Sequence, residues 1–460
     1  MRVVKAIYRT SSASELDHEL IRKYSLSERE LIDNAGSGAY SIIKNKLVGK
    51  RVLFVIGKGN NGADGLEVAR LASLDGIDSY LMYLFDSGSD ENVRRRKTLS
   101  LPTSDSIDDF DVIVDAIFGF GFKGELDQRL SCIVDSINKS SSYVISLDFP
   151  SAMRIKADET IVFMVNKLDL LNPETRENAG RVTLLNPGFP HDELVESKDG
   201  IYLLEDKDLT VKPFGIADYK NSRGHVAVVG GSLRYPGAPI LAIKSAFKTG
   251  AGLVTLVSKE EILLYTFGYY PSVILRKEEE VDFQVYSSIV VGPGWDEGNE
   301  KVLEKAIEAR RPIVIDADGI KLLKGKTLNN KGIITPHIGE YKRLCSLLDI
   351  PFDINSADSL LESLHKVASN LECVVVLKGS TVWISDGDKT YIYDGCNPSL
   401  GVAGSGDVLS GIIGALLSSG ESTLDAAING VILHQMAGVS AHSRYRYYSA
   451  EELIGEIKRP

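Results

Sequence analysis

Short apolar runs alternate along the chain with longer stretches in which apolar residues recur at helical spacing. Each run ends in a polar or glycine-rich turn, a pattern typical of buried parallel strands connected by helices. The runs predict strands at residues 51–56, 111–115, 143–147, 225–229, 253–257, 288–291, 312–315, 332–335 and 374–377. We therefore expect an α/β protein whose parallel sheets are covered by helices.

The length of the chain predicts more than one core. A chain of 460 residues exceeds what one hydrophobic core usually organises. The alternating pattern is interrupted near residues 204–219 by charged residues, Pro213 and Gly215. We therefore expect two domains, residues 1–205 and residues 206–460, and neither repeats the other.

Composition narrows the class of partner. The 52 Lys and Arg residues against 63 Asp and Glu residues give a net charge of −11, which disfavours binding to nucleic acid or to an anionic membrane and favours a small-molecule substrate. The four cysteines are scattered, so neither a disulfide framework nor a zinc site is indicated. No apolar run is long enough to cross a bilayer, and residues 1–10 lack a secretory signal, so we expect a cytoplasmic protein. The basic run at residues 94–97 is interpreted as a solvated face.

Polar side chains follow three predicted strands of the first domain. A loop with the sequence GKGNNGADG follows the first strand, Asp115 ends the second, and Asp148 and Ser151 follow the third. Since ligands bind at the carboxyl ends of parallel strands, these segments are expected to face one crevice. Asn61, Asp115 and Ser151 offer only oxygen ligands, which suit a hard, weakly charged cation. The alternative is that the two aspartates are solvated turn residues.

The motifs DNAG, NNGADG, VDAIFG and SLDFPS at residues 33–36, 60–65, 114–119 and 146–151 resemble the NAD(P)H-hydrate epimerase domain, which is Rossmann-like with three layers. The resemblance implies epimerisation of hydrated NADH or NADPH, with K⁺ bound by Asn61, Asp115 and Ser151. It assigns a catalytic role to Asp148. The implied substrate-binding residues are Asn60, Asn61, Gly62, Ala63, Asp64, Gly119, Phe120, Gly121, Phe122, Lys123, Gly124, Glu125 and Asp148.

Two alanines depart from this family pattern. Ala63 and Ala152 stand where the family usually has glycine. A Cβ can exclude a positive-φ backbone or crowd a phosphate, so the retention of epimerase activity stays open at this point.

The segment Gly404-Ser405-Gly406-Asp407 of the second domain precedes an apolar helical pattern that ends near residue 417. Small residues at a helix N-terminus bring backbone N–H groups close to an anion, so we expect a phosphate site there. A carboxylate repels phosphate, so its presence at such a site is explained if it takes a proton from an incoming hydroxyl. This would be the role of Asp407. The alternative is that Asp407 only caps the helix.

Further turns follow strands of the second domain. His337 lies in a proline-fixed turn and is interpreted as a substrate contact, and the alternative is a structural histidine. Residues 378–381 (KGST) supply a cation and two hydroxyls suited to a nucleotide, or form a hairpin turn, and both can hold at once.

The motifs GGS, GPG, DADG, TPH, KGS and GSGDVL at residues 230–232, 292–294, 316–319, 335–337, 378–380 and 404–409 resemble the ADP- or ATP-dependent NAD(P)H-hydrate dehydratase, which has a ribokinase-like α/β fold. The resemblance implies Mg²⁺ with the nucleotide, Asp407 as the catalytic base and a homo-oligomer. It implies hydrated-cofactor contacts at Ala238, Gly294, His337 and Asp407, and nucleotide contacts at Lys378, Gly379, Ser380, Thr381, Gly404, Ser405 and Gly406.

Fused in this order, the two resemblances predict repair of hydrated NADH and NADPH. The first domain would interconvert the two hydrate isomers, and the second would transfer a phosphoryl group to the hydroxyl so that it leaves as phosphate. The sequence does not choose between ADP and ATP, but the lack of an organelle-targeting segment favours ADP. The alternative is a vitamin or sugar kinase of the ribokinase-like fold with a non-catalytic N-terminal binding domain.

Overall fold

The structure is a computed structural model that describes residues 4–122, 124–267 and 270–460. Lys123, which the sequence assigns to the first site, therefore lies outside the described residues. The chain divides into two compact units, Lys5–Ile201 and Tyr202–Pro460, and Val4 belongs with the second. The division falls at β9 (Ile201–Leu204).

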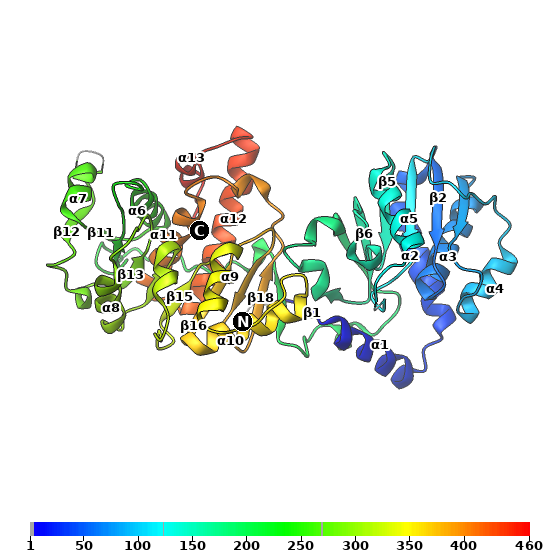
Figure 1. Ribbon diagram of the computed structural model, residues 1–460, viewed down its shortest axis with the longest axis horizontal. Helices are drawn as coiled ribbons and strands as arrows, with labels where there is room; N and C mark the ends of the chain where they lie inside the picture. The colour runs from blue at the N-terminus through cyan, green and yellow to red at the C-terminus, as the bar shows by residue number, and fades with distance from the viewer. Residues whose placement is uncertain (1–3, 123, 268–269) are drawn as a thin grey trace. The chain divides into compact units, whose positions relative to one another are not determined.

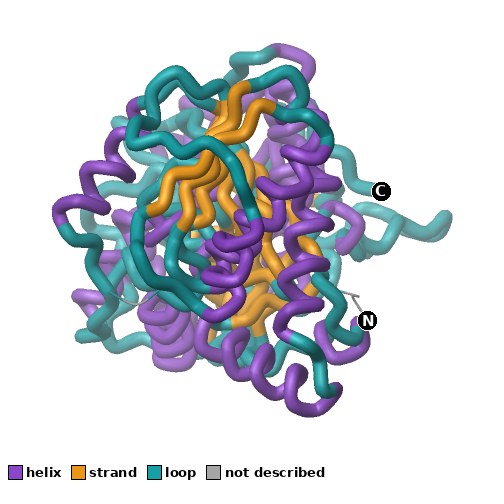
Figure 2. Tube along the Cα trace, turned by 90° about the vertical axis from the view of Figure 1, so that its right-hand side faces the viewer, coloured by secondary structure: helices purple, strands orange, loops and turns teal. Residues whose placement is uncertain are grey.

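The first unit is built on a parallel sheet with the strand order β3-β2-β4-β5-β6-β8. Residues 52–56 of β2 are fully buried, as expected of a strand covered on both faces. Figures 1 and 2 show helices on both sides of the strands. The strands are β2 (Arg51–Ile56), β3 (Asp78–Tyr83), β4 (Val112–Ala116), β5 (Tyr143–Leu147), β6 (Glu159–Phe163) and β8 (Arg181–Leu185).

The helices of the first unit cover the sheet because the strands expose apolar residues alternately to each face. One core holds Phe54 with residues of α2 and α3, and the other holds Leu53 with residues of α5. The remaining pair of strands is parallel, β1 (Lys5–Tyr8) with β7 (Asn166–Lys167). The helices are α1 (Thr10–Tyr24), α2 (Glu28–Leu47), α3 (Asn60–Leu74), α4 (Asp90–Thr98) and α5 (Gln128–Lys139).

The second unit has the strand order β12-β11-β10-β13-β14-β15-β16-β17-β18. The pairs from β12 to β16 are parallel, and the last two pairs are antiparallel. The strands are β10 (His225–Val229), β11 (Leu253–Ser258), β12 (Ile274–Lys277), β13 (Ser288–Val291), β14 (Ile313–Ile315), β15 (Gly332–Ile334), β16 (Cys373–Leu377), β17 (Val382–Ser385) and β18 (Thr390–Tyr393). The helices are α6 (Ala238–Thr249), α7 (Glu260–Phe267), α8 (Glu300–Glu308), α9 (Ile338–Leu347), α10 (Ala357–Leu371), α11 (Ser405–Ser418), α12 (Thr423–Tyr445) and α13 (Ala450–Gly455).

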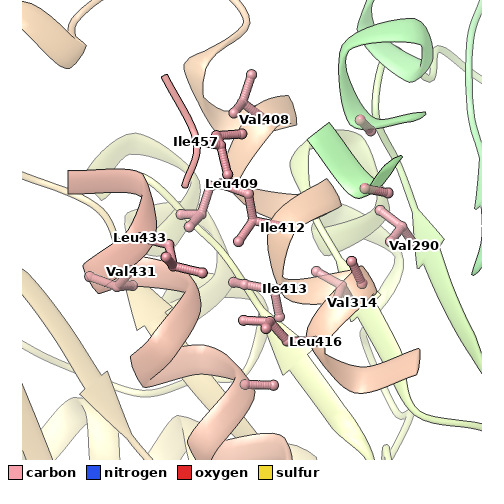
Figure 3. Close-up of a cluster of buried hydrophobic side chains, with 14 of the residues drawn as sticks. Val290, Val314, Val408, Leu409, Ile412, Ile413, Leu416, Val431, Leu433 and Ile457 are labelled. Carbon is pink, nitrogen blue, oxygen red and sulfur yellow. The ribbon is translucent and has the colours of Figure 1, made fainter. Parts of the chain in front are cut away.

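Helix α11 is the centre of the core of the second unit. Its apolar residues lie between the sheet and α12, with Ile413 and Leu416 beside Val290 and Val314 (Figure 3). Leu433 of α12 belongs to the same cluster. Helix α11 is therefore fixed against strands, α6 and α12 at once.

Both sheets reverse their strand order at one point, where the loops after β2 and β4 lie in the first unit and the loops after β10 and β13 lie in the second. In the first unit the chain runs from β2 to β3 on one side and then to β4 on the other. In the second unit it runs from β10 to β11 and β12, and then to β13 on the opposite side. Such switch points open a crevice outside the carboxyl ends of the strands. The sites described below lie at these ends.

Every predicted strand is present, with ends that differ by at most one residue from β2, β4, β5, β10, β11, β13, β14, β15 and β16. The prediction of a loop over residues 57–65 is wrong in its second half, because α3 already begins at Asn60. The Asn92 side chain donates to the carbonyl oxygens of Gly57 and Gly59 at 3.0 and 3.2 Å, and this holds the short turn that feeds the helix. Among the described residues, none of the helices is both long and apolar enough to cross a membrane.

Candidate functional sites

Asp115 and Ser151 form a hydrogen-bonded pair at the carboxyl end of β4. Ser151 Oγ donates to Asp115 Oδ1 at 2.6 Å, and the Ser151 N–H donates to Oδ2 at 2.9 Å. Asp115 also accepts from Ser146 Oγ and from the Ile117 N–H. Burial raises the pKa of Asp115, although these donors act in the opposite direction. The carboxylate is therefore fully buried and held by four hydrogen bonds.

Asp148 lies at the end of β5 in an ion pair with a buried lysine. Lys167 Nζ lies 2.8 Å from Asp148 Oδ1, and the lysine side chain is fully buried. Asp148 Oδ2 accepts from the Phe120 N–H at 3.0 Å. The Asp148 backbone has a φ of 62°, which is uncommon for a residue with a Cβ and is typical of functional sites. The sequence motifs did not point to Lys167 as a partner of Asp148, and no short spacing signals it.

Asn61 and Asp64 lie on the first turn of α3, three residues apart, and so share one face of the helix. Both the Oδ1 and the Nδ2 of Asn61 are buried and lack a hydrogen-bond partner in the described structure. Burial, and secondarily repulsion from Asp148, raises the pKa of Asp64 well above its usual range. A Cβ added at Gly119 would lie 2.7 Å from Asp148 Oδ2 and 3.6 Å from the Asn61 Cβ. The three predicted segments therefore meet at one place.

The other predicted residues of the first site differ in their surroundings. Asn60 Nδ2 donates to Glu28 Oε1 at 2.5 Å on the surface. Ala63 is fully buried within α3, so the expected conflict between its Cβ and a positive φ does not arise. Ala152 has a φ of 56°, a conformation that glycine adopts without penalty and alanine at a cost of about 1–2 kcal/mol. Phe122 stacks on Phe118 with ring centroids 4.1 Å apart.

The loop before α11 has the geometry of an anion site. Gly404 is the N-cap residue with a φ of 88°, and a Cβ there would lie 2.4 Å from Leu241 Cδ1. The Ser405 N–H donates to the Val402 carbonyl at 3.2 Å. No hydrogen bond within the described chain uses the N–H groups of Gly406 and Asp407. These two N–H groups point along the helix axis toward the N-terminal opening, where the helix dipole favours negative charge.

Asp316 joins this loop to Lys378. Lys378 Nζ lies 3.0 Å from Asp316 Oδ1, and a Cβ added at Gly406 would lie 3.2 Å from Nζ. Burial lowers the pKa of Lys378, but the attraction of Asp316 and Glu340 outweighs it, so the pKa is raised overall and the ammonium stays charged. Asp316 follows β14 directly, which is the signal that could have marked it as a site residue.

Asp407 has an unusual acidity in this cluster. Burial, and secondarily repulsion from Asp316, raises the pKa of Asp407 to about 7, although Lys378 acts in the opposite direction. Within the part of the chain that the structure describes, the Asp407 carboxyl group accepts no hydrogen bond from the first turn of α11. The structure therefore gives no support to a purely capping role for Asp407, and its carboxylate is suited to proton transfer near neutral pH.

Ala238 and Gly294 lie side by side at the second switch point. A Cβ added at Gly294, whose φ is 70°, would lie 2.9 Å from the Ala238 Cβ. His337 is largely exposed and its Nδ1 accepts from the Gly339 N–H, which forms a capping box with Glu340 at the start of α9. The backbones of His337 and Lys378 form an isolated β-bridge, so His337 borders the Lys378 segment while also capping a helix.

The segment 378–381 forms the turn between β16 and the antiparallel β17, as the hairpin interpretation predicts. Thr381 is fully buried, and its Oγ1 accepts from Trp383 Nε1 at 3.0 Å. Lys378 thus projects from a turn whose far end is fixed in the core. No motif in the sequence pointed to one further neighbour, His434 of α12. Its Nε2 lies 3.1 Å from Ser405 Oγ and 3.0 Å from the Ser405 carbonyl oxygen.

Comparisons with known proteins find a matching family model in each of the two domains. A family model described as NAD(P)H-hydrate dehydratase matches residues 226–459, and one described as YjeF-related protein N-terminus matches residues 28–168. The bifunctional NAD(P)H-hydrate repair enzyme Nnr of Thermofilum pendens is 30% identical over 95% of this chain and 92% of its own. The chain belongs to the bifunctional NAD(P)H-hydrate repair enzyme family. The dehydratase description agrees with the resemblance of the second domain, and the bifunctional repair enzymes match across both domains.

A second relative and a solved structure also match this chain. The Nnr protein of Escherichia coli is 30% identical over 94% of this chain and 89% of its own. A ribokinase-like superfamily protein from Enterococcus faecalis superposes with a TM-score of 0.51 and 22% identity, covering 56% of this chain and 94% of that one. The predicted fold class, α/β with a Rossmann-like unit followed by a ribokinase-like unit, is confirmed. Membership of the repair-enzyme family does not favour the alternative of a vitamin or sugar kinase.

Proposed function

We propose that residues 1–205 epimerise the two isomers of hydrated NADH and NADPH, and that residues 206–460 dehydrate them with ADP, or ATP, as the phosphoryl donor. The observation that carries the second half of the proposal is the position of Asp407. Its carboxyl group, whose pKa is raised to about 7, lies in the first turn of α11 within the electrostatic influence of Lys378, whose ammonium faces the preceding residue Gly406. Such a combination serves phosphoryl transfer to a hydroxyl.

The chemistry needs activation of a poor leaving group. Hydration of the dihydronicotinamide ring places a hydroxyl on a saturated carbon, and hydroxide leaves slowly at neutral pH. Phosphorylation converts this hydroxyl into a phosphate ester. The lone pair of the ring nitrogen then expels phosphate and forms an iminium ion, and loss of a proton from the adjacent ring carbon to solvent restores the double bond.

Each residue of the second site has a role in this proposal. Asp407 accepts the proton of the hydroxyl as the oxygen attacks the terminal phosphorus. Lys378 and the N–H groups of Gly406 and Asp407 stabilise the negative charge on the phosphoryl oxygens. Ala238, Gly294 and His337 border the hydrated cofactor, and the segment 378–381 with residues 404–406 borders the nucleotide.

We propose that Mg²⁺ arrives with the nucleotide. The described residues contain no group of three or more His, Cys, Asp or Glu side chains that could hold a metal ion. The few carboxylates here fit an ion that is bound mainly by phosphate oxygens and water, as Mg²⁺ usually is. The ion would neutralise charge on the phosphates.

In the first site, we propose that Asp148 acts on the hydrate and that Asn61, Asp115 and Ser151 bind K⁺. The unpartnered Asn61 amide supports a ligand at this place, because a buried amide without a hydrogen bond is costly. The donor set contains only oxygen, as K⁺ requires. Asp115 and Ser151 already bond to each other, so an ion would share their remaining lone pairs. Its contribution would be a fixed positive charge.

Product analysis tests the dehydratase half. The full-length protein is incubated with the hydrate of NADH and ADP, and NADH, AMP and inorganic phosphate are measured. We expect one AMP and one phosphate for each NADH formed. A phosphorylated hydrate that accumulates without elimination would instead indicate a kinase. The cytoplasmic location and the homo-oligomeric state stay predictions.

A further inference from the structure

His434 is a buried histidine that the proposed mechanism does not use. It lies on α12, is 7% exposed, and makes both of its described hydrogen bonds with Ser405. The neighbouring Leu433 is fixed in the core with Leu409 and Ile412 (Figure 3). The imidazole therefore approaches the anion loop from a rigid helix on the side of the hydrophobic core.

The protonation of His434 follows from these contacts. Burial lowers the pKa of His434 to about 4, so the ring is neutral at physiological pH. A carbonyl oxygen can only accept a hydrogen bond. Since Nε2 lies 3.0 Å from the Ser405 carbonyl oxygen, Nε2 carries the proton and donates it to that oxygen. The Ser405 hydroxyl oxygen, 3.1 Å from Nε2, then accepts from the same N–H group.

The carbonyl that receives this hydrogen bond belongs to the same peptide group as the Gly406 N–H. A planar trans peptide points its C=O and N–H in opposite directions, so a fixed Ser405 carbonyl fixes the direction of the Gly406 N–H. A hydrogen bond to the carbonyl also polarises the peptide and makes its N–H a stronger donor. Gly406 is the residue whose α-carbon faces Lys378 Nζ.

We propose that His434 is a positioning residue of the dehydratase site, which holds the Ser405–Gly406 peptide so that the Gly406 N–H remains directed at the phosphoryl oxygens during transfer. This inference rests on the proposed function. A neutral imidazole suits the role because Lys378 already supplies the positive charge of the site. A donor that acts on charge formed in the transition state affects kcat more than KM.

Three variants of the full-length protein test the role. His434→Leu removes the donor, His434→Gln places an amide N–H near the position of Nε2, and His434→Asn places it near that of Nδ1. We expect His434→Leu to lower kcat for nucleotide-dependent dehydration by about 10–100-fold with KM within about twofold. We expect His434→Gln to recover most of kcat, and His434→Asn to recover less.

The outcomes separate this inference from the proposed function. An inactive wild-type protein would overturn both. An active wild type with an unaffected His434→Leu variant would overturn the role of His434 alone, and so would equal losses in the Leu and Gln variants. If His434→Leu fails to fold, the role of His434 is judged by comparing kcat of the folded Gln and Asn variants. A Gln variant that is no faster than the Asn variant contradicts the proposal.

Discussion

Lys378 Nζ lies 3.0 Å from Asp316 Oδ1, and the same ammonium faces the Gly406 backbone at the start of α11. One cation therefore connects the end of β14 with the anion loop that carries Asp407. The pair does two things at once. Asp316 keeps the lysine charged and in place, and its own negative charge helps to raise the pKa of Asp407. A base that titrates near neutrality follows from this arrangement.

The Asp407→Asn variant tests the base directly. Loss of the proton acceptor should lower kcat for dehydration by about 10²–10⁴-fold, while nucleotide binding persists because the loop N–H groups remain. The measurement is steady-state kinetics together with nucleotide titration by calorimetry. Asp318→Asn is the matched control, because Asp318 is a partly exposed carboxylate paired with Lys321. Near wild-type turnover in the Asp407 variant would rule out the base.

The pH dependence of kcat tests the electrostatics of the cluster. The ionised form of Asp407 is the active one, and its pKa is raised to about 7 from the ordinary 3.8. Activity should therefore fall as the pH drops through about 7, rather than near 4. In Asp316→Asn the acidic limb of the pH profile of kcat should move to lower pH, because the negative charge that helps to raise the pKa of Asp407 is removed. An unmoved limb would contradict the role given to Asp316, and Asp318→Asn again serves as the control.

Gly404→Ala tests the shape of the anion loop. Gly404 and Gly420 have almost the same φ, 88° and 89°. Alanine in this region costs about 1–2 kcal/mol at either position. Only at Gly404 would the Cβ also meet Leu241 and Ala450, whereas nothing lies within 4 Å at Gly420. We expect Gly404→Ala to lose more stability and most of its dehydratase activity, and Gly420→Ala to lose only stability. Thermal unfolding and kinetics measure both, and equal effects on activity would contradict the account.

Lys167→Met tests the first site without disturbing the second. Removing one partner of a buried ion pair costs about 3–5 kcal/mol, and Asp148 would lose the ammonium 2.8 Å away. We expect at least about a tenfold loss of epimerisation, with dehydration of the correct isomer unchanged. Isomer interconversion is followed by chromatography. Lys156→Met is the control, because Lys156 pairs with Glu177 on the surface. Retained epimerisation in the Lys167 variant would remove Lys167 from the site.

Sequence patterns predicted the strands and the positions of the loops because buried parallel strands are nearly continuous apolar runs with sharp ends. They did not predict that Asn60 begins a helix, since the hydrogen bonds from Asn92 come from a distant segment. The interpretation of residues 94–97 as a solvated face is wrong for Arg95, which is 6% exposed and pairs with Glu67 and Asp33. Ion pairs across helices leave no local pattern.

In the candidate sites, too, residues with a local sequence signal were named, and residues that depend on distant contacts were not. Asp407, Lys378 and Asp148 were named as candidates from the sequence because each directly follows a strand or opens a helix. Asp316 was quoted only within the DADG motif, although it also follows a strand, and Lys167 and His434 were not named as site residues. The contacts that join these three residues to the sites are made with residues 19 to 62 positions away in sequence. Glycine spacing marks a loop, but only the fold shows which side chains support it.

The recovery of reduced nicotinamide from mixed hydrates tests both proposed activities together. The full-length protein is incubated with a mixture of both hydrate isomers of NADH and with ADP or ATP, and the recovery of reduced-nicotinamide absorbance is followed. The account predicts complete recovery by the wild type, recovery of one isomer's share by Asp148→Asn after correction for spontaneous epimerisation, and almost none by Asp407→Asn. Recovery without nucleotide, or full recovery by Asp407→Asn, would contradict it.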